Sequence, residues 1–106
     1  MKRPTRKGEK VVNIAIYYQK SEQETSEDSV NRINELIQVL EEPHTIKGVF
    51  IDRQVESNAL IELLSSPLSQ IEFIYINKPF KNEFDSELVH QLARTENFKI
   101  KYFDEI

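Results

Sequence analysis

Apolar positions along the chain follow two alternating patterns. Short runs of β-branched and aromatic residues are typical of strands buried in a parallel sheet. They predict four strands, over residues 11–18, 46–51, 71–76 and 98–103. Between these runs, apolar residues recur at helical spacing. They predict three helices, the first from about Asp28 to Pro43, the second from about Asn58 to Pro67, and the third from Asp85 to Arg94.

The order of elements is therefore β-α-β-α-β-α-β. Alternating strands and helices imply a mainly parallel sheet with right-handed crossovers, so we expect a three-layer α/β fold with four strands and three helices. In the last strand, Lys99 and Lys101 alternate with apolar residues, which predicts a sheet edge with one wet face.

Ligands of open α/β sheets bind beyond the carboxyl ends of the strands. In this chain those ends are expected at residues 18–21, 51–53, 76–78 and 103–104. Any active site should be sought there.

Length and composition indicate one folded domain. The chain has 106 residues, of which 39% are hydrophobic and 30% charged, a balance typical of globular proteins. Residues 1–10 carry a net charge of +4 and are expected to form a flexible basic arm, whereas residues 11–106 form the α/β domain and carry −8. An acidic body disfavours non-specific DNA binding. The arm could touch nucleic acid, although a solvated terminus is the simpler interpretation.

Other features of the composition exclude several kinds of site. The chain has no cysteine, which suits a reducing cytosol, and no apolar run long enough for a membrane span. We expect a cytoplasmic protein without membrane contact. Only Gly8 and Gly48 are glycines, so a phosphate-binding loop is absent. His44 is expected in a turn after Pro43 and His90 in the third helix. Neither is placed beside Ser21, and both are expected on the surface. No metal site and no cofactor is predicted.

Several stretches together resemble one family. Residues 14–24 contain Tyr17, Tyr18, Gln19, Lys20 and Ser21. They resemble the first strand and nucleophile loop of the serine recombinases (resolvases and invertases), which typically read Tyr-x-Arg-x-Ser followed by Gln. Residues 48–52, 74–84 and 99–105 are similar to the next three strands and to the Asp-Arg-x-x-Arg segment of that family. The resemblance covers residues 11–105 and implies a resolvase-like domain.

In that family the serine attacks a DNA phosphodiester and forms a phosphoserine link, while arginines hold the phosphate. By resemblance, Ser21 falls on the nucleophile and Gln19 on the first arginine. Phe80, Lys81 and Phe84 fall on the Asp, Arg and Arg of the later motif. An arginine in a phosphoryl-transfer transition state contributes on the order of 10³–10⁵ in rate, and Lys81 lacks the bidentate fork. Most of the cations that the chemistry needs are therefore missing.

The missing cations favour a non-catalytic, pseudoenzyme interpretation: a protein-interaction or regulatory module that binds a partner, or itself, through Pro79, Phe80 and Phe84. The family also continues into a long dimerisation helix and a DNA-binding module, and we recognise neither here.

Two alternatives stay open. In the first, the protein is a DNA strand-transfer enzyme, with Ser21 as nucleophile and Lys20, Lys78 and Lys81 as cations, joined by Arg53 if that side chain converges on the serine. In the second, Lys20, Asn77 and Lys78 bind a small molecule or phosphate.

Overall fold

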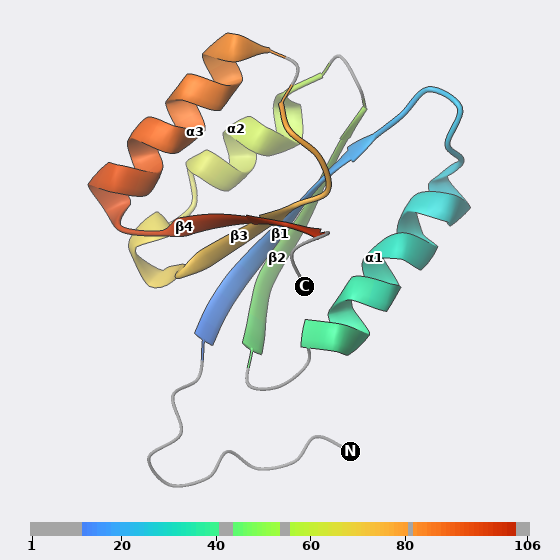
Figure 1. Ribbon diagram of the computed structural model, residues 1–106, viewed down its shortest axis with the longest axis horizontal. Helices are drawn as coiled ribbons and strands as arrows, with labels where there is room; N and C mark the ends of the chain where they lie inside the picture. Colours follow the sequence, from blue (N-terminus) through green and yellow to red (C-terminus); the bar gives the residue numbers. More distant parts are fainter. Residues whose placement is uncertain (1–11, 41–43, 54–55, 81, 104–106) are drawn as a thin grey trace, which may run out of the picture.

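The computed structural model describes residues 12–40, 44–53, 56–80 and 82–103. These residues form one sheet of four parallel strands in the order β2-β1-β3-β4 (Figure 1). In chain order the strands are β1 (Val12–Lys20), β2 (His44–Arg53), β3 (Phe73–Ile76) and β4 (Lys99–Tyr102). The predicted α/β fold is confirmed, and β4 is an edge strand as its alternating pattern indicated.

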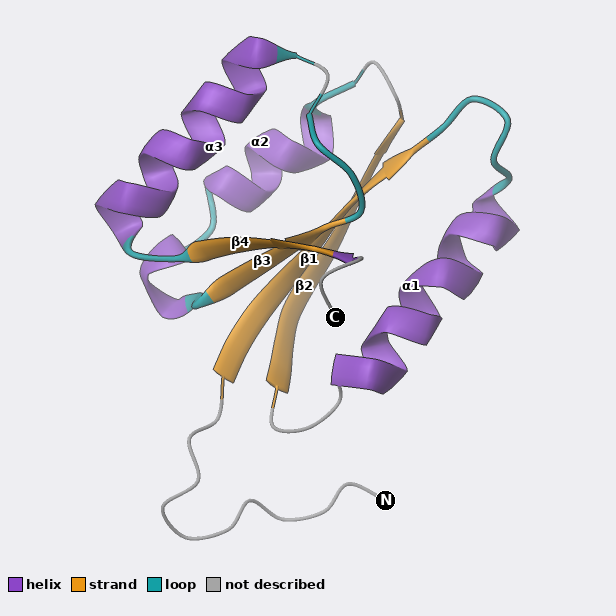
Figure 2. Ribbon diagram, viewed as in Figure 1, coloured by secondary structure: helices purple, strands orange, loops and turns teal. Residues whose placement is uncertain are grey.

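Helices cover both faces of the sheet, so the molecule has three layers (Figure 2). The helices are α1 (Ser26–Leu40), α2 (Asn58–Leu64) and α3 (Glu83–Glu96), with a short 3₁₀ helix η1 (Leu68–Gln70). Helix α1 lies alone on one face, and α2 and α3 lie on the other (Figure 1). None of the helices in the described ranges combines the length and the apolar character that a membrane crossing requires.

The core has two parts, separated by β1. Ile14 and Ile16 point towards α1, where they pack with Leu36 and Leu40. Ala15 and Tyr17 point the other way and pack with side chains of α2, α3 and β3, among them Leu60, Leu63, Ile74, Ile76 and Val89. Every residue from Ile14 to Tyr18 is at most 2% exposed. Burial on both faces explains why β1 reads as a continuous apolar run instead of an alternating one.

Local signals fix the helix ends. At the start of α1, the Thr25 hydroxyl accepts a hydrogen bond from the Asp28 amide at 3.0 Å, and the Asp28 carboxylate accepts one from the Thr25 amide at 3.2 Å. This reciprocal pair is a capping box. Helix α3 starts after Asn82, whose side chain accepts from the Phe84 amide, and ends at Asn97 in the left-handed conformation (φ 63°).

Each predicted element differs from the observed one by one to three residues at one or both ends. Strand β2 begins at His44 and ends at Arg53, so it extends the predicted range by two residues at each end. Strand β3 starts at Phe73, because η1 occupies the chain just before Ile71. Helix η1 was not predicted. The basic arm, Val11 and Asp104 lie outside the described residues.

The prediction that His44 is a surface residue of a turn was wrong. His44 is the first residue of β2 and is half-buried, with its ring edge-on to Tyr75 at 6.4 Å between centroids. Within the described part of the chain, its Nδ1 atom is buried without a hydrogen-bond partner. His90 is exposed on α3, as expected.

Candidate functional site

The carboxyl ends of β1, β2 and β3 meet at one edge of the sheet, as the sequence predicted (Figure 1). The paired part of β1 and β3 stops at Tyr17 and Ile76. Beyond it, the Asn77 side chain accepts from the Gln19 amide at 2.8 Å and donates to the Gln19 carbonyl at 3.0 Å. An asparagine side chain thus continues the ladder between the two strands where the backbones diverge.

Gln19 has a second structural contact. Its Nε2 atom donates to the Lys78 carbonyl at 2.6 Å, and the residue is only 8% exposed. In the serine-recombinase resemblance this position belongs to an arginine. Here the side chain holds the loop after β3 against β1. Its amide group is buried and bonded to the Lys78 carbonyl. It therefore does not take the place of an arginine that would bind a phosphate group.

Ser21 follows β1 directly and faces a carboxylate. Its amide and its hydroxyl both donate to Oε1 of Glu24, at 3.2 and 3.3 Å. The other oxygen of Glu24 accepts hydrogen bonds from the hydroxyls of Tyr18 and Ser29. The Glu24 carboxylate therefore accepts four hydrogen bonds, two of which come from Ser21.

These contacts shift two pKa values. Burial alone raises the pKa of Glu24, but the hydrogen bonds from Tyr18, Ser21 and Ser29 outweigh it and lower the pKa below its ordinary value. Burial, followed by the hydrogen bond to Glu24, raises the pKa of Tyr18 to about 12. Glu24 is therefore a carboxylate at neutral pH, and Tyr18 is a neutral donor to it.

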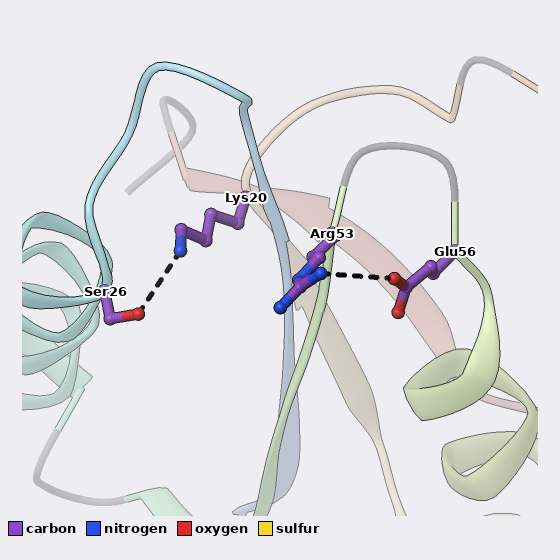
Figure 3. A network of polar contacts seen from close by, with 4 residues as sticks. All are labelled: Lys20, Ser26, Arg53 and Glu56. Atoms are coloured by element: carbon purple, nitrogen blue, oxygen red, sulfur yellow. Dashed lines mark hydrogen bonds and ion pairs between the residues drawn. The ribbon is translucent and has the colours of Figure 1, made fainter.

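Two predicted cations, Lys20 and Arg53, contact other residues: Lys20 points toward Ser26 and Arg53 toward Glu56 (Figure 3). They are register partners at the ends of β1 and β2. The Lys20 ammonium donates to the Ser26 hydroxyl at 3.2 Å. Arg53 extends to Glu56 at 3.9 Å, with 79% of its side chain exposed. Among the described residues, neither side chain bonds to the Ser21 hydroxyl, whose partner is Glu24.

The remaining predicted residues are placed as follows. The Lys78 carbonyl accepts a hydrogen bond from Gln19. The Lys78 ammonium has no hydrogen bond or ion pair with the described residues. Lys81, the possible substitute for a catalytic arginine, lies outside the described residues. Phe80 is half-buried and stacks on Tyr17 with ring centroids 5.7 Å apart. Phe84 is 69% exposed on α3. The suggested surface of Pro79, Phe80 and Phe84 therefore combines one packed ring and one exposed ring.

A shallow hollow of about 450 Å³ lies beside Ser21. It is lined by Ser21, Gln23, Glu24, Asp28, Asn31 and Arg32. Two carboxylates and one guanidinium give this lining an excess of negative charge. In the described part of the chain, Arg32 is the one positive side chain of this lining, so the hollow lacks the cluster of cations that would hold an anion. Among the described ranges, no group of three or more His, Asp or Glu side chains is arranged to hold a metal ion.

Sequence reasoning missed the roles of two acidic residues. Glu24 stands three residues after Ser21, and this Ser-x-x-Glu spacing lets a carboxylate accept a hydrogen bond from an upstream amide. The spacing was overlooked because Glu24 is one of several acidic residues in this stretch. Asp52 is 4% exposed and accepts from the Tyr17 hydroxyl and from the amides of Ala59 and Leu60. A lone Asp at a strand end carries no comparable signal, because its partners come from distant residues.

Comparison of this chain with family models, with curated protein sequences and with solved structures yields no match, so the functional assignment depends on the residues and geometry described above.

Proposed function

We propose that this chain is a non-catalytic α/β domain of resolvase-like design that acts through protein contacts. The observation that carries the proposal is the hydrogen bond from the Ser21 hydroxyl to the Glu24 carboxylate. A phosphoryl-transfer site presents its nucleophile to fixed positive groups that hold the phosphate. Here the nearest charged partner of the hydroxyl is negative.

Glu24 is also poorly suited to activate the serine. A general base works best when its pKa lies near the operating pH. The hydrogen bonds that Glu24 accepts lower its pKa, so its affinity for a proton is weakened. The carboxylate would also repel a phosphodiester approaching the hydroxyl. Both effects support a structural role for Ser21, which ties the loop after β1 to the start of α1.

Protein binding is supported by apolar side chains that remain outside the core. Val49 and Ile51 on β2 are 39% and 42% exposed, and Phe84 on α3 is 69% exposed. Aromatic and aliphatic groups on a charged surface suit protein contacts, whereas phosphate recognition requires clustered cations.

The test is a search for a covalent protein–DNA adduct. The full chain is incubated with supercoiled plasmid and with nicked duplexes of randomised sequence, and products are separated in denaturing detergent. Ser21→Ala is the test variant. Ser26→Ala is the matched control, because Ser26 is a nearby exposed serine. We expect the wild type to give no more adduct than Ser21→Ala. An adduct that disappears in Ser21→Ala and persists in Ser26→Ala contradicts the proposal.

A further inference from the structure

Strand β2 forms a long edge of the sheet. It spans ten residues and pairs with β1 along its length. In the ranges that the structure describes, no strand pairs with its outer side. Edge strands of this kind present backbone N–H and C=O groups that can accept a further strand.

One face of this edge carries apolar side chains that are partly exposed. Val49 and Ile51 are register partners of Ile16 and Tyr18, so they lie on the α1 side of the sheet. Ile16 and Tyr18 are fully buried, whereas Val49 and Ile51 are 39% and 42% exposed. Only α1 lies on this face (Figure 1). A strand added beside β2 would place its own side chains against Val49 and Ile51.

The other face of the edge contains a small apolar cavity. The register between β1 and β2 shifts at Lys47, where β2 has one residue more than β1. Beneath this bulge lies a cavity of about 180 Å³, whose lining includes Ala15, Gly48, Phe50, Pro67 and Ile71. A dry cavity of roughly 150 Å³ accepts a benzene molecule. The space therefore fits one leucine or phenylalanine side chain from an added strand.

The charges along the edge are positive, although the whole chain carries −4. Lys47 and Arg53 are exposed near the two ends of the apolar segment, and Lys20 neighbours Arg53. The Arg53 guanidinium lies 3.9 Å from the Glu56 carboxylate, which offsets part of its charge, but 79% of its side chain stays exposed. The acidic residue of the strand, Asp52, is buried and bonded to Tyr17 and α2. Opposite charges on facing strands attract, and like charges repel. The edge thus favours a strand that carries carboxylates at both ends.

The same charges disfavour a second copy of this chain. In an antiparallel pairing of two β2 strands centred on Phe50, each Lys47 would lie opposite the Arg53 of the other copy. Because β2 has no exposed acidic residue, no other register of the two strands would bring Lys47 or Arg53 opposite a carboxylate. Lysine and a bulge are devices by which edge strands avoid indiscriminate pairing.

From these observations we propose that the β2 edge binds an extended segment of a partner protein, with acidic residues flanking a short apolar stretch. The segment adds a fifth strand beside β2, inserts one apolar side chain into the cavity at the bulge, and contacts Val49 and Ile51 on the opposite face. This assignment rests on the proposed function and names the partner class and the surface that function would use.

The test uses the full chain labelled with ¹⁵N and two synthetic peptides. Both contain the same alternating valine and threonine stretch with a central leucine. One peptide has aspartate and glutamate at its ends, and the other has lysines. Amide shifts of the chain are followed during each titration. We expect the acidic-ended peptide to shift amides from Lys47 to Arg53 and to bind about ten-fold more tightly than the lysine-ended peptide.

Three variants sharpen the result, each checked for its fold by circular dichroism. The double variant Lys47→Glu, Arg53→Glu should reverse the preference between the two peptides. Ile51→Gln should weaken binding several-fold. Ile61→Gln is the matched control, since Ile61 is an exposed isoleucine (60%) on α2, and it should leave binding unchanged.

Three results would overturn the assignment. The first is that neither peptide shifts the β2 amides, and the second is that the two peptides bind equally. The third is that the β2 amides broaden with protein concentration alone, which would identify a second copy as the occupant. Shifts confined to the region of Phe84 would contradict the β2 surface while agreeing with the proposed function. A Ser21-dependent DNA adduct contradicts the proposed function itself, so the two failures are distinguishable.

Discussion

The Tyr17 hydroxyl donates a hydrogen bond of 2.8 Å to the carboxylate of Asp52, which joins the buried ends of β1 and β2. The same carboxylate accepts from the amides of Ala59 and Leu60 at 2.7 and 2.9 Å. Those amides belong to the first turn of α2, where backbone donors lack partners within the helix. Asp52 therefore caps α2 from the neighbouring strand, while Ser57, the residue before the helix, bonds instead to Asp85 at 2.7 Å.

We predict that Asp52→Ala lowers the free energy of unfolding by about 3 kcal/mol, because it leaves one hydroxyl and two amide donors without their acceptor. Tyr17→Phe removes a single donor and should cost about 1 kcal/mol. Urea unfolding followed by circular dichroism measures both. Equal losses from the two substitutions would show that the contact with α2 contributes little.

A second prediction concerns alkaline pH. The pKa of Tyr18 is raised from 10.0 to about 12 by burial and by its bond to Glu24. A group whose pKa is raised on folding contributes stability that is complete below its unfolded pKa. This contribution should be lost as the pH rises from about 10 to about 12. Urea midpoints measured across this range should fall, and they should fall less in Tyr18→Phe. A pH-independent midpoint would contradict the account.

A third prediction separates the two phenylalanines of the suggested surface. Phe80 stacks on buried Tyr17 and packs against the core of α2 and α3, so Phe80→Ala should lower the free energy of unfolding by about 2 kcal/mol. Phe84 is 69% exposed, so Phe84→Ala should change it by less than about 0.5 kcal/mol. Thermal unfolding provides the comparison. Similar losses from both substitutions would place Phe84 in the core as well.

The strands and helices could be predicted from the sequence because the spacing of apolar residues follows directly from which side chains are buried. The run from Ile14 to Tyr18 has no polar residue, and both of its faces are covered. The lysines of β4 identified an edge, although Lys101 is partly covered and its ammonium lies 4.7 Å from the Phe73 ring centroid. The order of elements and the convergence of the strand ends followed from those patterns.

The chemistry of the strand ends was harder to predict, because it depends on which side chains meet. Lys20 and Arg53 are adjacent at the strand ends, yet Lys20 contacts Ser26 and Arg53 contacts Glu56. Position along a strand does not determine the direction of a long flexible side chain. His44 was misplaced for a related reason: Pro43 indicated a turn, but β2 begins at the very next residue.

Among the described residues, no cluster of cations surrounds Ser21, and a titration with inorganic phosphate tests directly whether this serine lies in a phosphate site. The amide shifts of Ser21 and Glu24 are followed in the labelled full chain, with Glu24→Gln as the comparison. We predict no saturation below about 10 mM phosphate for the wild type, and tighter binding in Glu24→Gln because the repelling charge is gone. Saturable binding by the wild type below about 1 mM, abolished in Lys20→Gln or Arg32→Gln, would contradict the account.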